Sequence, residues 1–183
     1  MEHVAGRLSL AARAGVTAMK WVLACLLSFS AVTTSAAVET QSLQRGSFQK
    51  IIAAHAGKPF IVALWSLSCT HCAADLEIFQ RLAKKHAEFD LVLISTDTPA
   101  EEVVLASTLA RYQLGRLAVD RRGRVESWVF ADSYVERLRY EIDASWYGEL
   151  PRTYFFDSRG KARGVSGVLD EARLENWLKI SGN

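Results

Sequence analysis

Two cysteines separated by two residues, Cys69 and Cys72, carry the clearest chemistry in this sequence of 183 residues. They follow an apolar, β-branched run and open a segment in which Leu76, Phe79 and Leu82 recur at helical spacing. In the order strand, C-x-x-C, helix, such a pair is typical of a dithiol that cycles between reduced and disulfide-bonded forms. The first sulfur would lie near the positive end of the helix, which stabilises a thiolate.

The N-terminal residues have the order of a secretory signal. Lys20 precedes an apolar run at residues 21–32, and small residues then lead to Ala36 and Ala37. The run is shorter than the ~20 residues that span a bilayer, although an uncleaved anchor is the alternative. We therefore predict an exported, periplasmic protein, cleaved near Ala37 and translated from Met19.

Removal of this signal would also remove Cys25, the third cysteine of the chain. The exported protein would then contain Cys69 and Cys72 alone. An exported chain with two cysteines has no framework of structural disulfides, so its one intramolecular disulfide would be the C-x-x-C itself.

The composition argues against several other classes of function. The chain is 50% hydrophobic and 23% charged, as in ordinary globular proteins, and its net charge of +2 gives no reason to expect nucleic acid as a partner. Zinc would need two further ligands near the cysteines. The histidines of the exported chain, His55, His71 and His86, do not form a second suitably spaced pair.

Apolar periodicity divides the exported chain into alternating strands and helices. Buried strands are expected at 60–65 and 91–95, with a helix from Cys69 to about His86 between them. This β-α-β-α order predicts a largely parallel sheet with helices on both faces. The other expected elements are a short helix within 42–56, a helix from the capping residue Thr98 to about Gln113, an extended segment at 117–120, a helix at 133–142, a hairpin of strands at 153–157 and 162–165, and a closing helix at 170–180.

Residues 121–148 are rich in aromatic side chains and are predicted to be an insertion. Tyr134, Leu138 and Ile142 are expected to face inward from a helix there. Core packing accounts for the aromatics, and a wall that faces the substrate is the alternative. The predicted organisation is a signal at 1–37, a linker at 38–47 and one domain at 48–183.

A second motif makes a family resemblance specific. Residues 148–153 have the pattern Gly-x-x-Pro-x-Thr and precede a predicted strand and turn. Together with Trp65 and the C-x-x-C helix, this segment resembles the thioredoxin fold, and within that fold the exported TlpA/ResA-type thiol–disulfide oxidoreductases. The resemblance covers residues 48–180 and implies an α/β, thioredoxin-like fold with a central mixed sheet flanked by helices.

The resemblance also implies roles for residues around the pair. Cys69 would attack a substrate disulfide and Cys72 would resolve the mixed disulfide. Pro151 would be a cis-proline that faces the sulfurs and leaves the backbone of Leu150 free to pair with an extended substrate segment. No cofactor is expected beyond the Cys69–Cys72 pair itself.

Some neighbours of the pair depart from the family pattern. Asp75 stands where TlpA/ResA-type proteins carry glutamate, and we expect it to tune the proton of Cys72; a solvated helix residue is the alternative. His71 would lower the pKa of the Cys69 thiol, as in strongly oxidising periplasmic enzymes, or simply face solvent. The residues expected to tune the pair or line a substrate groove are therefore Trp65, His71, Asp75, Leu150 and Pro151.

The function implied by the resemblance is reduction or exchange of disulfides in exported proteins. Its partners would be protein disulfides or dithiols, together with a thiol–electron donor in the membrane that resets the pair. His71 points to the opposite, oxidising direction, so the direction stays open at this stage. The alternative function is a redox-sensing or copper-binding module that does not turn over.

Overall fold

The computed structural model describes residues 39–86, 90–114 and 124–181. The signal predicted at 1–37 and the extended segment predicted at 117–120 lie outside the described residues. The strands are β1 (Thr40–Leu43), β2 (Phe60–Trp65), β3 (Leu91–Ser95), β4 (Val125–Phe130), β5 (Arg152–Phe156) and β6 (Ala162–Ser166). The helices are α2 (Ser47–Ala54), α3 (Cys72–Lys85), the 3₁₀-helix η1 (Pro99–Glu101), α4 (Glu102–Arg111), α5 (Val135–Ile142) and α6 (Glu171–Ser181).

The described strands form one mixed sheet in the order β1-β4-β3-β2-β5-β6. The pairs β1–β4, β4–β3 and β3–β2 are parallel, whereas β5 runs antiparallel to β2 and β6 antiparallel to β5. The structure therefore confirms the thioredoxin-like mixed sheet. None of the helices in the described ranges has the length and apolarity needed to cross a bilayer.

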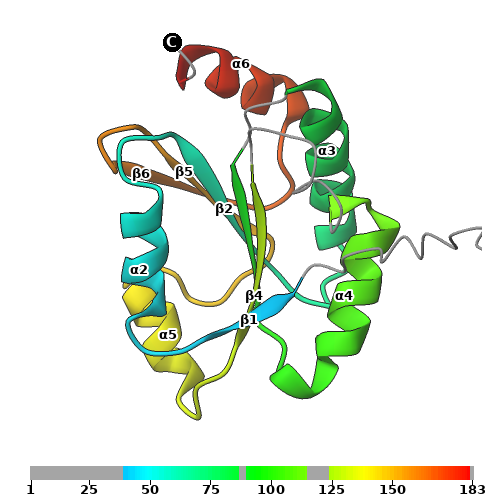
Figure 1. Cartoon of the computed structure of the whole chain (residues 1–183), viewed down its shortest axis with the longest axis vertical. Helices are drawn as coiled ribbons and strands as arrows, with labels where there is room; N and C mark the ends of the chain where they lie inside the picture. The colour runs from blue at the N-terminus through cyan, green and yellow to red at the C-terminus, as the bar shows by residue number, and fades with distance from the viewer. Residues whose placement is uncertain (1–38, 87–89, 115–123, 182–183) are drawn as a thin grey trace, which may run out of the picture. The chain divides into compact units, whose positions relative to one another are not determined.

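Helices cover both faces of this sheet, and each face has its own apolar core. Helices α3, α4 and α6 lie on one side and α2 and α5 on the other (Figure 1). Strand β2 explains why both sides are covered: all its residues are buried, and alternate side chains enter opposite cores. Ala63 and Trp65 pack with α3 and α4, while Val62 and Leu64 pack with α2 and α5. A strand buried on both faces is a rigid support for whatever follows it.

Two parts of the sheet were missed by the sequence analysis. Residues 40–43, assigned to a linker, form β1 and pair with β4 through their backbones. The segment assigned to an insertion, 121–148, supplies both β4, an inner strand of the sheet, and α5. Strand β1 buries only its two end residues, so its side chains show no alternating pattern that could have predicted it.

The aromatic side chains of the 121–148 segment are divided between core and surface. Trp146 is buried on the α2–α5 side of the sheet, and so is Leu138, which was expected to face inward. Tyr134, expected to face inward, is 63% exposed because α5 begins one residue later, at Val135. Tyr147 is 92% exposed. Core packing therefore explains only some of these aromatic residues.

A buried cluster of charges joins three elements where β2 and β3 begin. His55, which follows α2, stacks on Phe60, and its Nδ1 lies 3.2 Å from Asp90 Oδ2. Its Nε2 lies 3.4 Å from Glu126 Oε1, an ion-pair distance rather than a well-formed hydrogen bond. Burial alone would lower the pKa of His55, but the contacts with Asp90 and Glu126 outweigh burial and the nearby Arg124, so the pKa is raised.

This cluster should make stability depend on pH. Because the folded pKa of His55 is raised, its contribution is fully present below the unfolded value of about 6.5 and is lost as pH rises through the folded pKa. In urea unfolding, His55→Gln should lose about 1–3 kcal/mol at pH 6 and less at pH 8. The same loss at both pH values would show that His55 is uncharged in the folded protein.

Candidate active site

The C-x-x-C lies on a turn between β2 and α3 rather than wholly within the helix. The helix was predicted to begin at Cys69, but it begins at Cys72, with His71 as its N-cap. The backbone N–H of Cys69 donates to the carbonyl of Ser66 at 3.2 Å, and that of Cys72 donates to the carbonyl of Cys69 at 3.3 Å. The carbonyl of Cys69 therefore accepts an N–H from three residues later, as in a turn, rather than from four residues later, as in an α-helix.

The two cysteines form a disulfide and differ in exposure. Their Cα atoms are 5.4 Å apart, and Cys72 is 1% exposed, whereas Cys69 is partly exposed. The backbone N–H of Cys72 also donates to Sγ of Cys69 at 3.2 Å. After reduction, this N–H and the positive end of α3 would stabilise a thiolate on Cys69. The arrangement suits attack by Cys69 and resolution by Cys72.

Asp97 fixes the loop that leads into the pair. Its Oδ2 accepts hydrogen bonds from the backbone N–H of Leu67 at 2.9 Å and from the hydroxyl of Ser95 at 2.6 Å. The N–H of Thr96 donates to the carbonyl of Trp65 at 2.9 Å, so the segment after β3 holds the segment after β2 at two points. Sequence analysis missed Asp97. Its place just after a parallel strand beside β2 was the available signal, because functional groups gather at the carboxyl ends of such strands.

Asp75 is a buried carboxyl group one helical turn beyond Cys72. Its Oδ1 accepts the N–H of Leu169 at 2.8 Å, and its Oδ2 has no hydrogen-bond partner among the described residues. Burial raises the pKa of Asp75 to about 6, and the bond from Leu169 only partly offsets this effect. Residues three apart on a helix are neighbours, so this group is placed to influence Cys72.

Trp65 and His71 occupy contrasting positions beside the pair. Trp65 is buried in the core on the α3 side of the sheet, and its indole N–H finds no acceptor in the described part of the chain. The side chain of Trp65 therefore packs in the core at the point where the active-site loop begins. His71 is exposed, and its side chain makes no hydrogen bond to the end of α3.

The predicted proline loop adjoins the end of β2. The bond between Leu150 and Pro151 is cis. Because Leu64 pairs with Arg152 across the antiparallel strands, the next position along this register places Pro151 beside Trp65, at the end of β2 from which the C-x-x-C follows. The carbonyl of Pro151 accepts the N–H of Gly167 at 2.9 Å. Pro151 is buried and Leu150 is partly exposed.

Two arginines hold this loop from the other side of the sheet. Arg152 forms an ion pair with Asp143 at 2.9 Å and donates to Ser166 at 2.6 Å. Hydrogen bonds to its carboxylate lower the pKa of Asp143 to about 2, and the bond from Ser145 contributes most to this shift. The ion pair of Arg152 and Asp143 is therefore charged at neutral pH. At Gly148, which has a φ of +97°, a Cβ would lie 2.9 Å from the guanidinium carbon of Arg139. The glycine of the motif therefore permits both the backbone conformation and the close packing of that arginine.

Comparison with solved structures places this site in a known fold. A thioredoxin-family thiol:disulfide interchange protein from Chlorobium tepidum TLS matches with a TM-score of 0.53 and 18% identity, over 72% of this chain and 84% of that one. An interchange protein described as DsbE, also from Chlorobium tepidum, matches with a TM-score of 0.50 and 16% identity, over 72% and 85%. No protein-family model and no curated protein matches the sequence.

The fold is therefore that of thioredoxin-like proteins, with a bonded C-x-x-C at the start of α3. At these identities the likeness defines the architecture, and the activity must be argued from the site. Within residues 39–86, 90–114 and 124–181, no three side chains from His, Cys, Asp and Glu gather as a metal-ligand set. The copper-binding alternative thus gains no further ligands from the described part of the chain.

Removal of the Asp97 carboxylate should loosen the active-site loop. Asp97→Ala leaves the N–H of Leu67 without its acceptor, so the free energy of unfolding should fall by about 1–3 kcal/mol and the Leu67 amide should exchange faster. Asp97→Asn keeps an acceptor oxygen and should lose less. Urea unfolding and amide exchange by NMR measure both effects. Equal losses in the two variants would contradict the assigned hydrogen bond.

Neutralising Asp75 should stabilise the folded protein at neutral pH. Its folded pKa is raised to about 6 from 3.8, so wild-type stability falls as pH rises through that interval. Asp75→Asn should therefore gain about 2–3 kcal/mol at pH 7.5 and little at pH 4. The exposed acid Glu77 on the same helix is the matched control, and Glu77→Gln should change stability by less than about 0.5 kcal/mol. Loss of stability in Asp75→Asn at pH 7.5 would contradict the burial of a charged carboxylate.

Proposed function

We propose that this protein is an exported thiol–disulfide oxidoreductase that reduces disulfides in other proteins through Cys69 and Cys72. The observation that carries the proposal is the unequal exposure of two bonded cysteines where β2 gives way to α3. The accessible sulfur can attack a substrate, and the sheltered sulfur, which the substrate does not reach first, can then release it by internal attack. Export is supported by the sequence of residues 1–37, which resembles a secretory signal.

The reaction consists of two exchanges. The thiolate of Cys69 attacks one sulfur of a substrate disulfide, which forms a mixed disulfide and releases the other substrate sulfur as a thiolate. Cys72 then loses its proton, and its thiolate attacks Sγ of Cys69. The second substrate sulfur leaves, and the Cys69–Cys72 bond closes. Two electrons have passed from the protein to the substrate, and an external thiol donor, which we place in the membrane, restores the dithiol.

The environment of Asp75 favours the reducing direction. Above its pKa of about 6, Asp75 carries a negative charge one turn from Cys72, and a nearby like charge disfavours a thiolate. A less stabilised dithiol makes the pair a stronger reductant. His71, the residue that pointed to an oxidising enzyme, is exposed and makes no capping hydrogen bond to α3, so we give Asp75 the greater weight.

The backbone of Leu150 and its partly exposed side chain form the remaining part of the proposed substrate site. The register between β2 and β5 places this segment at the end of β2, and the ion pair of Arg152 with Asp143 keeps it in place. An extended substrate segment would pair with this backbone beside Cys69. Recognition through the main chain suits an enzyme that acts on disulfides in different sequences.

A variant without the resolving sulfur should retain its substrates. In Cys72→Ser, attack by Cys69 still forms the mixed disulfide, but no internal thiol releases it. Pull-downs from oxidised extracts of exported proteins should recover adducts that dithiothreitol cleaves, at levels at least about tenfold above wild type. Cys69→Ser is the matched control and should trap far less, because its remaining sulfur is buried. Equal trapping by the two variants would contradict the assigned roles.

A further inference from the structure

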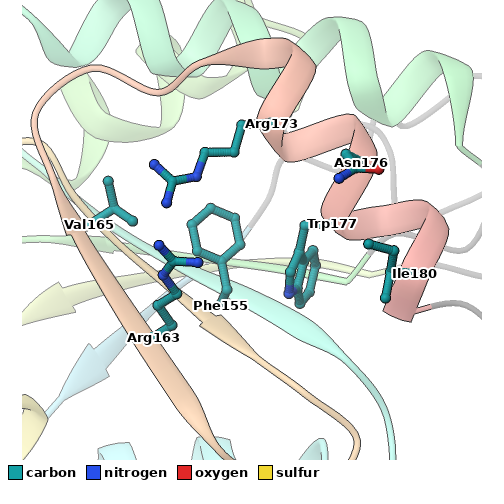
Figure 2. Close-up of a pocket in the computed structure, with 7 residues that line it drawn as sticks. All are labelled: Phe155, Arg163, Val165, Arg173, Asn176, Trp177 and Ile180. Carbon is teal, nitrogen blue, oxygen red and sulfur yellow. The ribbon is translucent and has the colours of Figure 1, made fainter.

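A pocket separate from the Cys69–Cys72 site lies between the β5–β6 hairpin and α6. Figure 2 shows its lining: Phe155, Val165, Trp177 and Ile180 supply apolar surface, and the guanidinium groups of Arg163 and Arg173 lie beside Phe155. The rings of Phe155 and Trp177 are 5.2 Å apart between centroids. In the part of the chain that the structure describes, Cys69, Cys72, Asp75 and Pro151 do not line this pocket.

The two arginines lack the acidic partners that neighbouring cations have. On the side of α6 that faces α3, Arg81 pairs with Glu171 and Lys85 pairs with Glu175. Within the described residues, neither Arg163 nor Arg173 has a carboxylate within ion-pair distance, and no acidic residue lines the pocket. Two uncompensated positive charges therefore adjoin an apolar surface.

Protection of the sheet edge explains only one of these charges. Strand β6 is at the edge of the sheet, and a charged side chain on an edge strand discourages pairing with other chains. Arg163 lies opposite Phe155 in the β5–β6 register and can serve that purpose. Arg173 belongs to α6 and protects no strand edge, so its approach to the same pocket needs another cause.

We propose that this pocket binds a small amphipathic carboxylate. The carboxylate would lie between the guanidinium forks of Arg163 and Arg173, which match its planar geometry, and its apolar chain or ring would contact Phe155 and Trp177. The pocket encloses about 220 Å³, below the 300–1,000 Å³ typical of sites for drug-sized ligands. That volume suits a medium-chain fatty acid or an aryl carboxylic acid.

This proposal does not depend on the redox function, and octanoate tests it. Calorimetry on the full protein should detect octanoate binding, and NMR should show a shift of the Trp177 indole N–H. Arg163→Gln and Arg173→Gln should each weaken binding by about tenfold. The control Arg111→Gln alters an exposed arginine at the end of α4 and should leave the affinity unchanged. Acetate and octanol, which each keep only half of the recognised chemistry, should bind at least about tenfold more weakly than octanoate.

Several outcomes would overturn the proposal. Absence of octanoate binding, equal binding of octanol, or affinity unchanged in both pocket variants would each do so. Binding of the protein to phosphatidylglycerol vesicles without binding of free octanoate would show that the arginines meet a lipid surface instead. The lining arginines are exposed, so melting temperatures near wild type should accompany the losses in affinity.

Discussion

The structure depends on one junction, where a strand buried on both faces ends and a helix begins. Strand β2 has no exposed side, so its last residue, Trp65, is fixed by packing. The turn that follows carries Cys69 outward and returns Cys72 to the core within the first turn of α3. Burial of one sulfur and partial exposure of the other follow from this geometry. The chemical asymmetry of the disulfide is therefore a consequence of how the core is packed.

Polar contacts hold the segments around this junction from two directions. Asp97 binds the loop before Cys69, and Arg152, through Asp143 and Ser166, holds the segment after the cis-proline. Apolar packing does not fix a loop in one conformation, whereas directional hydrogen bonds from rigid strand ends do. Asp75 adds a destabilising element to the same region, since a buried carboxyl with an unpaired oxygen reduces stability. Such a cost is common where a titratable group adjusts reactivity.

Much of the architecture could be predicted from the sequence because it depends on local patterns. The apolar runs of β2 and β3, the spacing of Leu76, Phe79 and Leu82, and the capping box at Thr98 all appear in the structure. The C-x-x-C likewise indicated the disulfide, and the Gly-x-x-Pro-x-Thr segment indicated the cis bond before Pro151. Strand β1 could not be predicted, because its place depends on backbone pairing with a strand far along the chain. Asp97 was missed although its place just after a strand predicted beside β2 was a signal, because its partner Leu67 is close only after β2 and β3 align.

The central claim is that Cys69 and Cys72 exchange two electrons reversibly, and an equilibrium redox titration tests it most directly. The protein without residues 1–37 would be equilibrated with glutathione or dithiothreitol buffers and alkylated, and its free thiols would be counted by mass spectrometry. The account predicts a reversible two-electron transition with a midpoint of about −270 mV, as in thioredoxin. A pair that fails to bridge under mild oxidant would contradict the claim. A midpoint of about −120 mV would still show that the two cysteines are a redox pair, but it would reverse the proposed direction of the reaction.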